Sequence, residues 1–435
     1  MRLIKSIIFC VVVASSLLRS EQPTSFNVIV KDLKIADKTV RVSPFQGVGV
    51  VTIQLCFKNA GEKLSPKNKE ALVALLSKSI GEATNKKTRE QLQDYASEHN
   101  VAVSCNSDDD DFVIMGRCPS NKLSELISLL KELLLESRFL EKDLTRFKNE
   151  ITAVAMQTLQ SPDAQLGEFI KETLLANHPY GALQATYLKS LKNIKGSDLK
   201  SYMKAYFSQE NLIIGVCGEF DEEVFINQLS SIVQALPKTG KINLPADHKI
   251  TGPYEMHSRK FSVPQTVIRM MHEGIDINHP DFFALQIAMG CLSNPGIGIL
   301  WKKIREEKGL TYGIGAGFTQ QDHFKAFCIQ TSTQTETVNQ TLQAIKEVLA
   351  DTYQNGIPAE LIETVKKSFL GNYKRSFAST QHIAARLTKY QRDGRPVDFH
   401  NVIIEKISAL TADEVNEALK RFLKLDQFVV FAVGE

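Results

Sequence analysis

The stretch LKNIKGSDLKSYMKAYFSQENLIIGVCGE, Leu191 to Glu219, has a related copy in ISALTADEVNEALKRFLKLDQFVVFAVGE, Ile407 to Glu435. The two align without a gap, and each ends in Gly-Glu. In both, apolar residues first recur at helical spacing and then form a continuous run, a pattern typical of an amphipathic helix followed by a buried strand. The two copies therefore indicate an internal repeat.

A second pair of helical segments supports the repeat. LEKDLTRFKNEI matches PAELIETVKKSF, with Leu144 over Ile362. A period of about two hundred residues is of domain size and far too long for a solenoid, so it indicates a duplicated domain. The predicted boundaries are a signal peptide at 1–20, a first domain at 21–240 and a second domain at 250–435, with a polar linker from Leu236 to Pro253.

The order of apolar patterns predicts the fold of each copy. In the first copy FNVIV and VGVVTIQLCFK are typical of strands, and NVAVSC and FVIMGRC of a hairpin. Ser65 and Pro66 are the expected start of a helix that runs through Ile80, and long helices are expected over 120–160 and 164–176. Strands paired by hairpins with helices in blocks indicate α+β domains, so we predict two homologous mixed sheets with helices on one face.

Four consecutive aspartates, Asp108 to Asp111, form the tip of the predicted hairpin. Carboxylate clusters bind divalent cations in some proteins. Aspartate is also a common turn residue, because its side chain bonds to nearby backbone. We predict a solvated turn here rather than a cation site.

Composition and charge exclude some classes of protein. With 435 residues, 43% of them hydrophobic, and a formal net charge of +3, the chain has globular composition without the basic excess of a nucleic-acid-binding protein. We therefore predict no nucleic-acid partner. The cysteines after the N-terminal segment are widely spaced and form no C-x-x-C pair, so no zinc knuckle or dense disulfide framework is indicated, and their pairing stays open.

The N-terminal segment predicts export. MRLIK supplies two positive charges, SIIFCVVVASSLL supplies an apolar run too short to span a bilayer with certainty, and the polar RSEQPTS follows. We predict a cleaved signal peptide, a periplasmic location and no stable membrane insertion after cleavage. The alternative is an uncleaved membrane anchor.

The segment LWKKIREEKGLTYGIGAGF, Leu300 to Phe318, carries a resemblance together with NHPYG, Asn177 to Gly181, and the order of the elements. It resembles the insulinase/pitrilysin family of inverted zinc metallopeptidases over nearly all of the chain that follows the predicted signal. The resemblance implies a pair of duplicated α/β domains that assembles with a second such pair into a chamber enclosing a peptide.

Active members of that family carry H-x-x-E-H on the first long helix, where two histidines at i and i+4 bind zinc from one face and the glutamate acts as general base. Laying this pattern on EALVALLSKSIGEAT places Ala74 and Lys78 at the histidines and Ser77 at the glutamate. The third metal ligand falls near Val154, with Glu150 one turn away. None of these degenerate positions supplies the family's ligand, so we expect no metal in this chain.

The resemblance assigns a role to Arg305 and Tyr312, because in the family an arginine and a tyrosine of the second domain hydrogen-bond the substrate carbonyl near the scissile bond. We expect a helix through Arg305, a left-handed cap at Gly309 and a returning strand from Tyr312. A guanidinium and a phenol are good donors to developing negative charge. The alternative is that Arg305 complements a helix C-terminus while Tyr312 packs in the core.

GCLSNPGIGIL, Gly290 to Leu300, resembles in shorter form the glycine-rich loop with which noncatalytic subunits of the mitochondrial processing peptidase contact peptide. Glycines allow close backbone approach to an extended chain. An ordinary turn is the equal alternative, because Asn-Pro-Gly is turn chemistry. The candidate substrate-binding residues are Gly290, Ser293, Asn294, Gly296 and Gly298.

Two functions follow from the resemblance. The first is an exported noncatalytic subunit of a heterodimeric zinc peptidase, inactive alone, which lends substrate-carbonyl binding in trans to an H-x-x-E-H paralogue that holds the zinc. The second is a scaffold or assembly protein of the same fold with no role in proteolysis. The segment around Arg305 and Tyr312 and the export signal favour the first. The peptide substrate, the identity of the partner and the formation of homodimers stay open.

Overall fold

The computed structural model describes residues 28–45, 47–241, 244–319 and 321–435. The first half of the chain builds a six-stranded sheet in the order β1-β2-β6-β3-β5-β4, in which only β2 and β6 run parallel. Its strands are β1 (Lys31–Ile35), β2 (Lys38–Pro44), β3 (Val50–Phe57), β4 (Ala102–Ser107), β5 (Phe112–Pro119) and β6 (Leu212–Gly218).

The second half builds a five-stranded sheet in the order β7-β11-β8-β10-β9. Its strands are β7 (Glu255–Lys260), β8 (Gln265–Glu273), β9 (Ile314–Phe318), β10 (Ala326–Gln334) and β11 (Val429–Gly434). The last strand of each copy, β6 or β11, lies between a parallel neighbour and an antiparallel one. The two sheets therefore share one topology, and the predicted α+β fold with two mixed sheets is confirmed.

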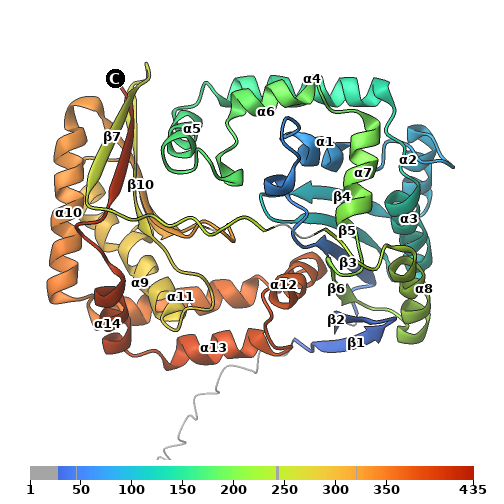
Figure 1. The fold of residues 1–435 in the computed structure, drawn as a ribbon. Coiled ribbons are helices and arrows are strands. Elements are labelled where there is room, and N and C mark those ends of the chain that lie inside the picture. Colours follow the sequence, from blue (N-terminus) through green and yellow to red (C-terminus); the bar gives the residue numbers. More distant parts are fainter. Residues whose placement is uncertain (1–27, 46, 242–243, 320) are drawn as a thin grey trace, which may run out of the picture.

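Helices surround both sheets (Figure 1). Those of the first half are α1 (Leu72–Ser79), α2 (Arg89–Glu98), α3 (Leu123–Glu136), α4 (Glu141–Thr158), α5 (Pro162–Leu174), α6 (Gln184–Leu191), α7 (Gly196–Tyr206) and α8 (Glu222–Ala235). Those of the second half are α9 (Phe282–Ser293), the π-helix η4 (Trp301–Glu307), α10 (Val338–Asn355), α11 (Ala359–Arg375), α12 (Thr380–Arg392), α13 (Phe399–Ala409) and α14 (Ala412–Phe422).

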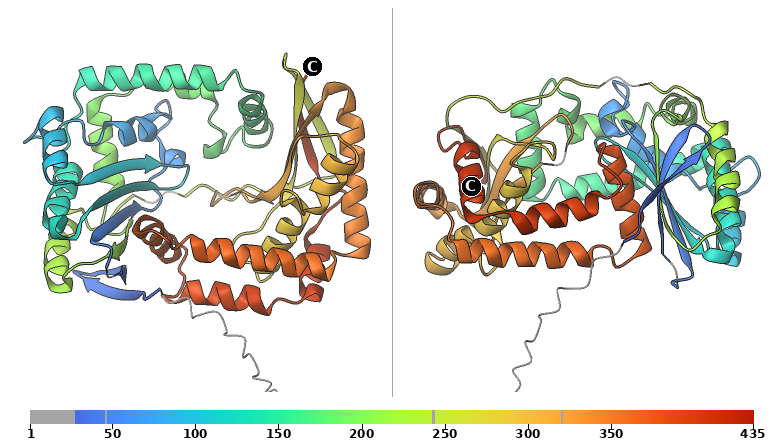
Figure 2. Two further views of the ribbon diagram at one scale, coloured as in Figure 1. Left: turned by 180° about the vertical axis from the view of Figure 1, so that it is seen from behind. Right: turned by 90° about the horizontal axis from the view of Figure 1, so that it is seen from below.

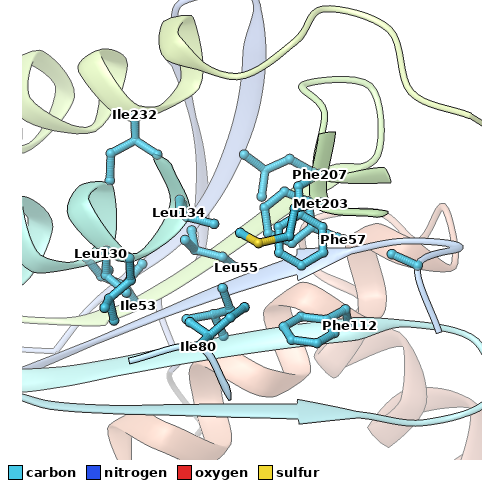
Figure 3. Packing of buried hydrophobic residues seen from close by; sticks show 14 of the residues in the cluster. Ile53, Leu55, Phe57, Ile80, Phe112, Leu130, Leu134, Met203, Phe207 and Ile232 are labelled. Carbon is cyan, nitrogen blue, oxygen red and sulfur yellow. The ribbon is translucent and has the colours of Figure 1, made fainter. Parts of the chain in front are cut away.

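The core of the first half lies between its sheet and helices α3, α7 and α8. Figure 3 shows side chains of β3 pointing toward Leu130 and Leu134 of α3 and Met203 of α7. Phe57 stacks on Phe207, with 4.1 Å between ring centroids. Burying one such ring contributes about 1.5–3 kcal/mol, so this face holds the first half together.

Each sheet is also covered on its other face by a helix from the opposite half (Figure 2). Helix α12 packs on β6 and β3, and it comes so close that a Cβ on Gly215 would lie 2.4 Å from Thr388 Oγ1. In return, Leu166 and Ile170 of α5 pack in one cluster with Phe431 of β11. The two halves therefore exchange equivalent helices, which the repeat alone did not predict.

Several predicted boundaries were wrong. The first strand begins at Lys31 rather than within FNVIV, and α1 begins at Leu72, because Ser65 ends a short 3-10 turn (Glu62–Leu64) instead of capping a helix. The expected helix over 120–160 is broken between α3 and α4, since Ser137 pairs with Thr84. Strand β3, the hairpin strands β4 and β5, and the closing strands β6 and β11 lie where they were expected.

The segment joining the halves runs extended between them (Figure 1). The N–H of Lys241 donates to Ala205 O at 2.8 Å, and that of Ile250 donates to the Glu273 carboxylate at 2.8 Å. The predicted signal peptide lies outside the described residues. No helix within the described part of the chain is long and apolar enough to cross a membrane.

Candidate functional site

Helices α1 and α4 pack against each other and bring the degenerate metal positions together. Ala74 and Lys78 of α1 line a cavity of about 410 Å³ whose other wall includes Val154 of α4. The i, i+4 spacing places the first two on one helix face, as the family pattern requires. The structure thus brings these three positions together, while their assignment as degenerate metal positions stays a prediction.

An ion pair occupies this place. Lys78 Nζ donates to Glu150 Oε1 at 2.7 Å, and this hydrogen bond lowers the pKa of the Glu150 carboxyl. Ser77, at the general-base position, donates its hydroxyl to the backbone oxygen of Ala74 at 2.9 Å. Both charged side chains are largely exposed, so the pair contributes little to stability.

The groups at these positions do not fit zinc. Zinc in proteins takes histidine nitrogen, cysteine sulfur or carboxylate oxygen, whereas Ala74, Lys78 and Val154 offer two alkyl groups and an ammonium. Glu150 is the carboxylate nearest to Val154 in the sequence, and it accepts a hydrogen bond from Lys78. Across the residues that the structure describes, no group of three or more His, Cys, Asp or Glu side chains could hold a metal ion.

The cavity is also lined by acidic and basic groups that the sequence did not single out. Glu62 is partly buried there, and its burial, reinforced by the nearby charge of Asp109, raises the pKa of its carboxyl to about 7. Glu70 turns one buried carboxylate oxygen toward no hydrogen-bond partner within the described structure. Lys171 of α5 lines the same cavity. These residues carry no motif, so spacing in the sequence could not have found them.

Beside this cavity a buried ion network joins the two halves. Lys63 pairs with Asp110 of the β4–β5 hairpin and lies 3.7 Å from Asp322 of the second half. Arg392, at the end of α12, bonds to Asp111 at 3.1 Å and to Asp322 at 2.6 Å. The predicted solvated turn was therefore wrong, because Asp110 and Asp111 are buried against cations from distant segments. In the sequence, only the run of four aspartates indicated that cationic side chains would pack nearby.

The NHPYG segment, Asn177 to Gly181, forms hydrogen bonds with residues beside this ion network. The Tyr180 hydroxyl donates to Asp110 Oδ1 at 2.6 Å and accepts the His323 N–H at 3.1 Å. His178 accepts the Tyr180 N–H at its Nδ1, so its Nε2 carries the proton and donates to Ala246 O at 3.0 Å. His178 is thus a structural residue that fixes the linker.

Arg305 and Tyr312 lie outside the cavity of Ala74 and Lys78. Arg305 is on η4, where its guanidinium stacks on Trp301 at 4.1 Å from the ring centroid. Gly309 has φ +64, as expected for a left-handed cap. Tyr312 precedes β9 and is 78% exposed, so the alternative that it packs in the core is wrong.

The glycine-containing segment after α9 forms a compact turn. Gly298 and Ile297 both donate their N–H to Asn294 O, and a Cβ on Gly298 would lie 2.7 Å from Asn294 N. Gly296 has φ +80, while Ser293 donates its hydroxyl to Met289 O at 3.0 Å. Gly290 and Asn294 line a second cavity, described below. The substrate-binding role of these residues stays a prediction.

Comparison with known proteins agrees with this geometry. Residues 193–369 match the family described as "Peptidase M16 inactive domain". The chain is 23% identical over 394 residues, 88% of each chain, to the "Non-peptidase homolog YmxG" of Helicobacter pylori. These matches confirm the resemblance to the insulinase/pitrilysin (M16) family, of the noncatalytic type, that the sequence predicted.

Two further likenesses fit this assignment. A crystal structure described as a peptidase M16 inactive domain from Pseudomonas fluorescens superimposes with a TM-score of 0.83, at 23% identity over 94% of this chain and 98% of that one. The probable mitochondrial-processing peptidase subunit alpha of Schizosaccharomyces pombe is 21% identical over 266 residues, 59% of this chain and 51% of its own. The structural match at this identity shows that the fold is shared.

Proposed function

We propose that this M16 chain is the noncatalytic subunit of a heterodimeric zinc peptidase. It is inactive alone and binds a paralogous subunit that carries H-x-x-E-H and zinc. In the complex, Arg305 and Tyr312 hold the carbonyl of the peptide substrate while the partner's metal site hydrolyses it. The chain is exported by its N-terminal segment and acts in the periplasm.

One observation carries this proposal: the phenol of Tyr312 is 78% exposed, although large aromatic side chains are ordinarily buried. It lies just past Gly309, on the segment that the helix of Arg305 precedes. Arg305 is also exposed, and its guanidinium stacks on the ring of Trp301. Two exposed donors on one segment are available to a ligand from outside the chain.

The position of these donors favours a site completed by a second chain. They lie in the second half, whereas the degenerate metal positions lie in the first half and line a different cavity. Lys78 and Glu150 pair with each other there, and the described residues hold no group of three or more His, Cys, Asp or Glu side chains that could bind a metal. A partner that supplies the metal and its general base would complete the reaction.

The alternative is a scaffold of the same fold without a role in proteolysis. The buried ion network of Lys63, Arg392 and three aspartates joins the two halves, which suits either function. A scaffold role does not explain why Tyr312 is exposed, so we favour the peptidase subunit.

The test is reconstitution. The mature chain and an H-x-x-E-H-bearing M16 paralogue from the same genome are expressed separately and together, and a quenched fluorescent peptide library is assayed with each sample. We expect hydrolysis by the mixture and none by this chain alone. A stable complex whose activity equals that of the paralogue alone would support the scaffold and overturn the proposal.

A further inference from the structure

A second cavity, of about 490 Å³, lies in the second half among α9, α11, α12 and α13 (Figure 1). Its size is within the range of small-molecule sites, roughly 300–1,000 Å³. Five of the sixteen residues that line it carry aromatic rings. These are Phe282, Phe283, Phe369, Tyr373 and Tyr390.

This cavity is the duplicate of the one beside α1 and α4. The same number of residues separates Leu144 from Ile362 and Lys171 from Lys389, so α4 and α5 align with α11 and α12 without a gap. In this register four positions line both cavities: Ile151 and Phe369, Val154 and Asn372, Ala155 and Tyr373, and Lys171 and Lys389. Duplication therefore placed one cavity in each half, and the second became aromatic.

Two cationic side chains, Arg386 and Lys389, and one carboxylate, Asp393, line the second cavity. The guanidinium of Arg386 lies over the rings of Tyr373 and Phe377, at 4.9 and 5.1 Å from their centroids. No carboxylate of the described residues forms an ion pair with it, whereas neighbouring Lys389 is paired with Asp393 at 2.9 Å. An arginine stacked on rings keeps its in-plane N–H groups available for a carboxylate.

The wall of this cavity is preformed. The hydroxyls of Tyr373 on α11 and Tyr390 on α12 are hydrogen-bonded at 2.6 Å. Helix α12 is held from its other side, where Ala384 and Thr388 contact Gly215 of the first sheet. These contacts restrain the rings of Tyr373 and Tyr390 before any ligand binds, and such restraint lowers the entropic cost of binding one.

We propose that this cavity binds an aromatic carboxylate about as large as one amino acid. Its ring packs among Phe283, Phe369 and Tyr373, and its carboxylate accepts hydrogen bonds from Arg386. A free aryl acid and the C-terminal aromatic residue of a peptide share this chemistry. The site is independent of zinc and of Arg305 and Tyr312, so it stands whether or not the chain is a peptidase subunit.

Calorimetric titration of the whole mature chain tests the site with matched probes. N-acetyl-L-phenylalanine carries ring and carboxylate, its amide lacks the charge, and N-acetyl-L-alanine lacks the ring. We expect the acid to bind at least about tenfold more tightly than either control, because the amide cannot form the charge-assisted hydrogen bond and N-acetyl-L-alanine buries no ring. Arg386→Gln should remove the preference for acid over amide, whereas Lys389→Gln should change binding by less than about twofold, since Lys389 is already paired.

Equal affinity for acid and amide, or an unchanged acid affinity in Arg386→Gln, would overturn the proposal. If Arg386→Gln does not fold, Asn372→Trp replaces it: Asn372 is exposed on α11 at the cavity mouth, and a tryptophan there should fill the cavity and abolish binding of the acid. Retained binding in that variant would contradict the assignment. A short peptide ending in phenylalanine, compared with the free acid, then distinguishes the two ligand sources.

Discussion

Lys78 Nζ lies 2.7 Å from the carboxylate of Glu150, across the contact between α1 and α4 where the sequence predicts the degenerate metal positions. The ammonium supplies one positive charge in place of a dication. It also satisfies the carboxylate nearest to the lost third ligand. Ala74, Lys78 and Val154 supply no zinc ligand, so a single substitution does not restore the site.

Restoring the metal site therefore requires four changes. The triple variant Ala74→His, Ser77→Glu, Lys78→His should bind zinc weakly and hydrolyse no peptide, because Val154 still supplies no ligand. Adding Val154→Glu should raise zinc affinity by at least about tenfold, as expected for one further ligand. Metal analysis after dialysis measures this. One tightly bound zinc in the unaltered chain would show that the degenerate motif has been misread.

The buried ion network and the exposed pair should respond differently to mutation. Arg392→Met leaves Asp111 and Asp322 buried without their cation, so we expect a loss of about 3–5 kcal/mol in the free energy of unfolding. The matched control Lys78→Met should cost at most about 1 kcal/mol, since its pair is exposed. Urea unfolding checks both. Equal losses would mean that the network does not hold the halves together.

Glu62 makes the stability of the chain depend on pH. Because the folded state raises the pKa of this carboxyl from 4.5 to about 7, the folded state holds the proton more tightly than the unfolded one. Its contribution to stability is then present below pH 4.5 and lost as pH rises to 7. Glu62→Gln should thus be more stable than the natural chain above pH 7, by on the order of 1–3 kcal/mol, with the difference vanishing near pH 4.5.

Thermal unfolding across pH 4–8 measures this difference, and Glu150→Gln is its control. The pKa of Glu150 is lowered by Lys78, so its contribution is present above the ordinary carboxyl pKa and lost in acid. The control should therefore be slightly less stable than the natural chain at neutral pH. A Glu62→Gln variant that behaves like the control would contradict the burial assigned to Glu62.

The linker should be the first site of limited proteolysis. Leu244, in the polar segment between Leu236 and Pro253, is 52% exposed, and exposed extended chain is readily cut. Because α5 and α12 are exchanged, the two fragments should stay together on gel filtration and separate only in denaturant. Native cleavage within 190–219 or 407–435 would contradict the repeat, and dissociation of the nicked chain would contradict the exchange.

Local pattern in the sequence was sufficient for much of this structure. The repeat predicted strands β6 and β11 and the helices before them, and the spacing of Ala74 and Lys78 placed both on one helix face beside Val154. These features depend on periodicity and on one motif, and both can be read within a short window.

Contacts between distant segments were not predictable in this way. The exchange of α5 and α12 depends on which sheet face each helix meets, and the burial of Asp110 and Asp111 depends on Lys63 and Arg392, which are far away in the chain. Ser65 and Pro66 look like the start of a helix, but the chain first makes a 3-10 turn whose backbone N–H groups bond to Asp108 and Asp109. Tertiary contacts overrode local preference at each of these places.

Tyr312 is the residue on which the proposed catalytic role of this chain depends most directly. Tyr312→Phe removes one exposed hydroxyl and keeps the ring, so it should leave the fold and the complex with the zinc-bearing partner intact. The decisive measurement is kcat/KM for peptide hydrolysis by that complex, alongside a titration of complex formation, with Tyr353→Phe, another exposed tyrosine, as the matched control. We predict a loss of about tenfold to a thousandfold for Tyr312→Phe, the range for removing one donor to a developing oxyanion, and none for the control. Full activity in an intact Tyr312→Phe complex would contradict the catalytic role proposed for this chain.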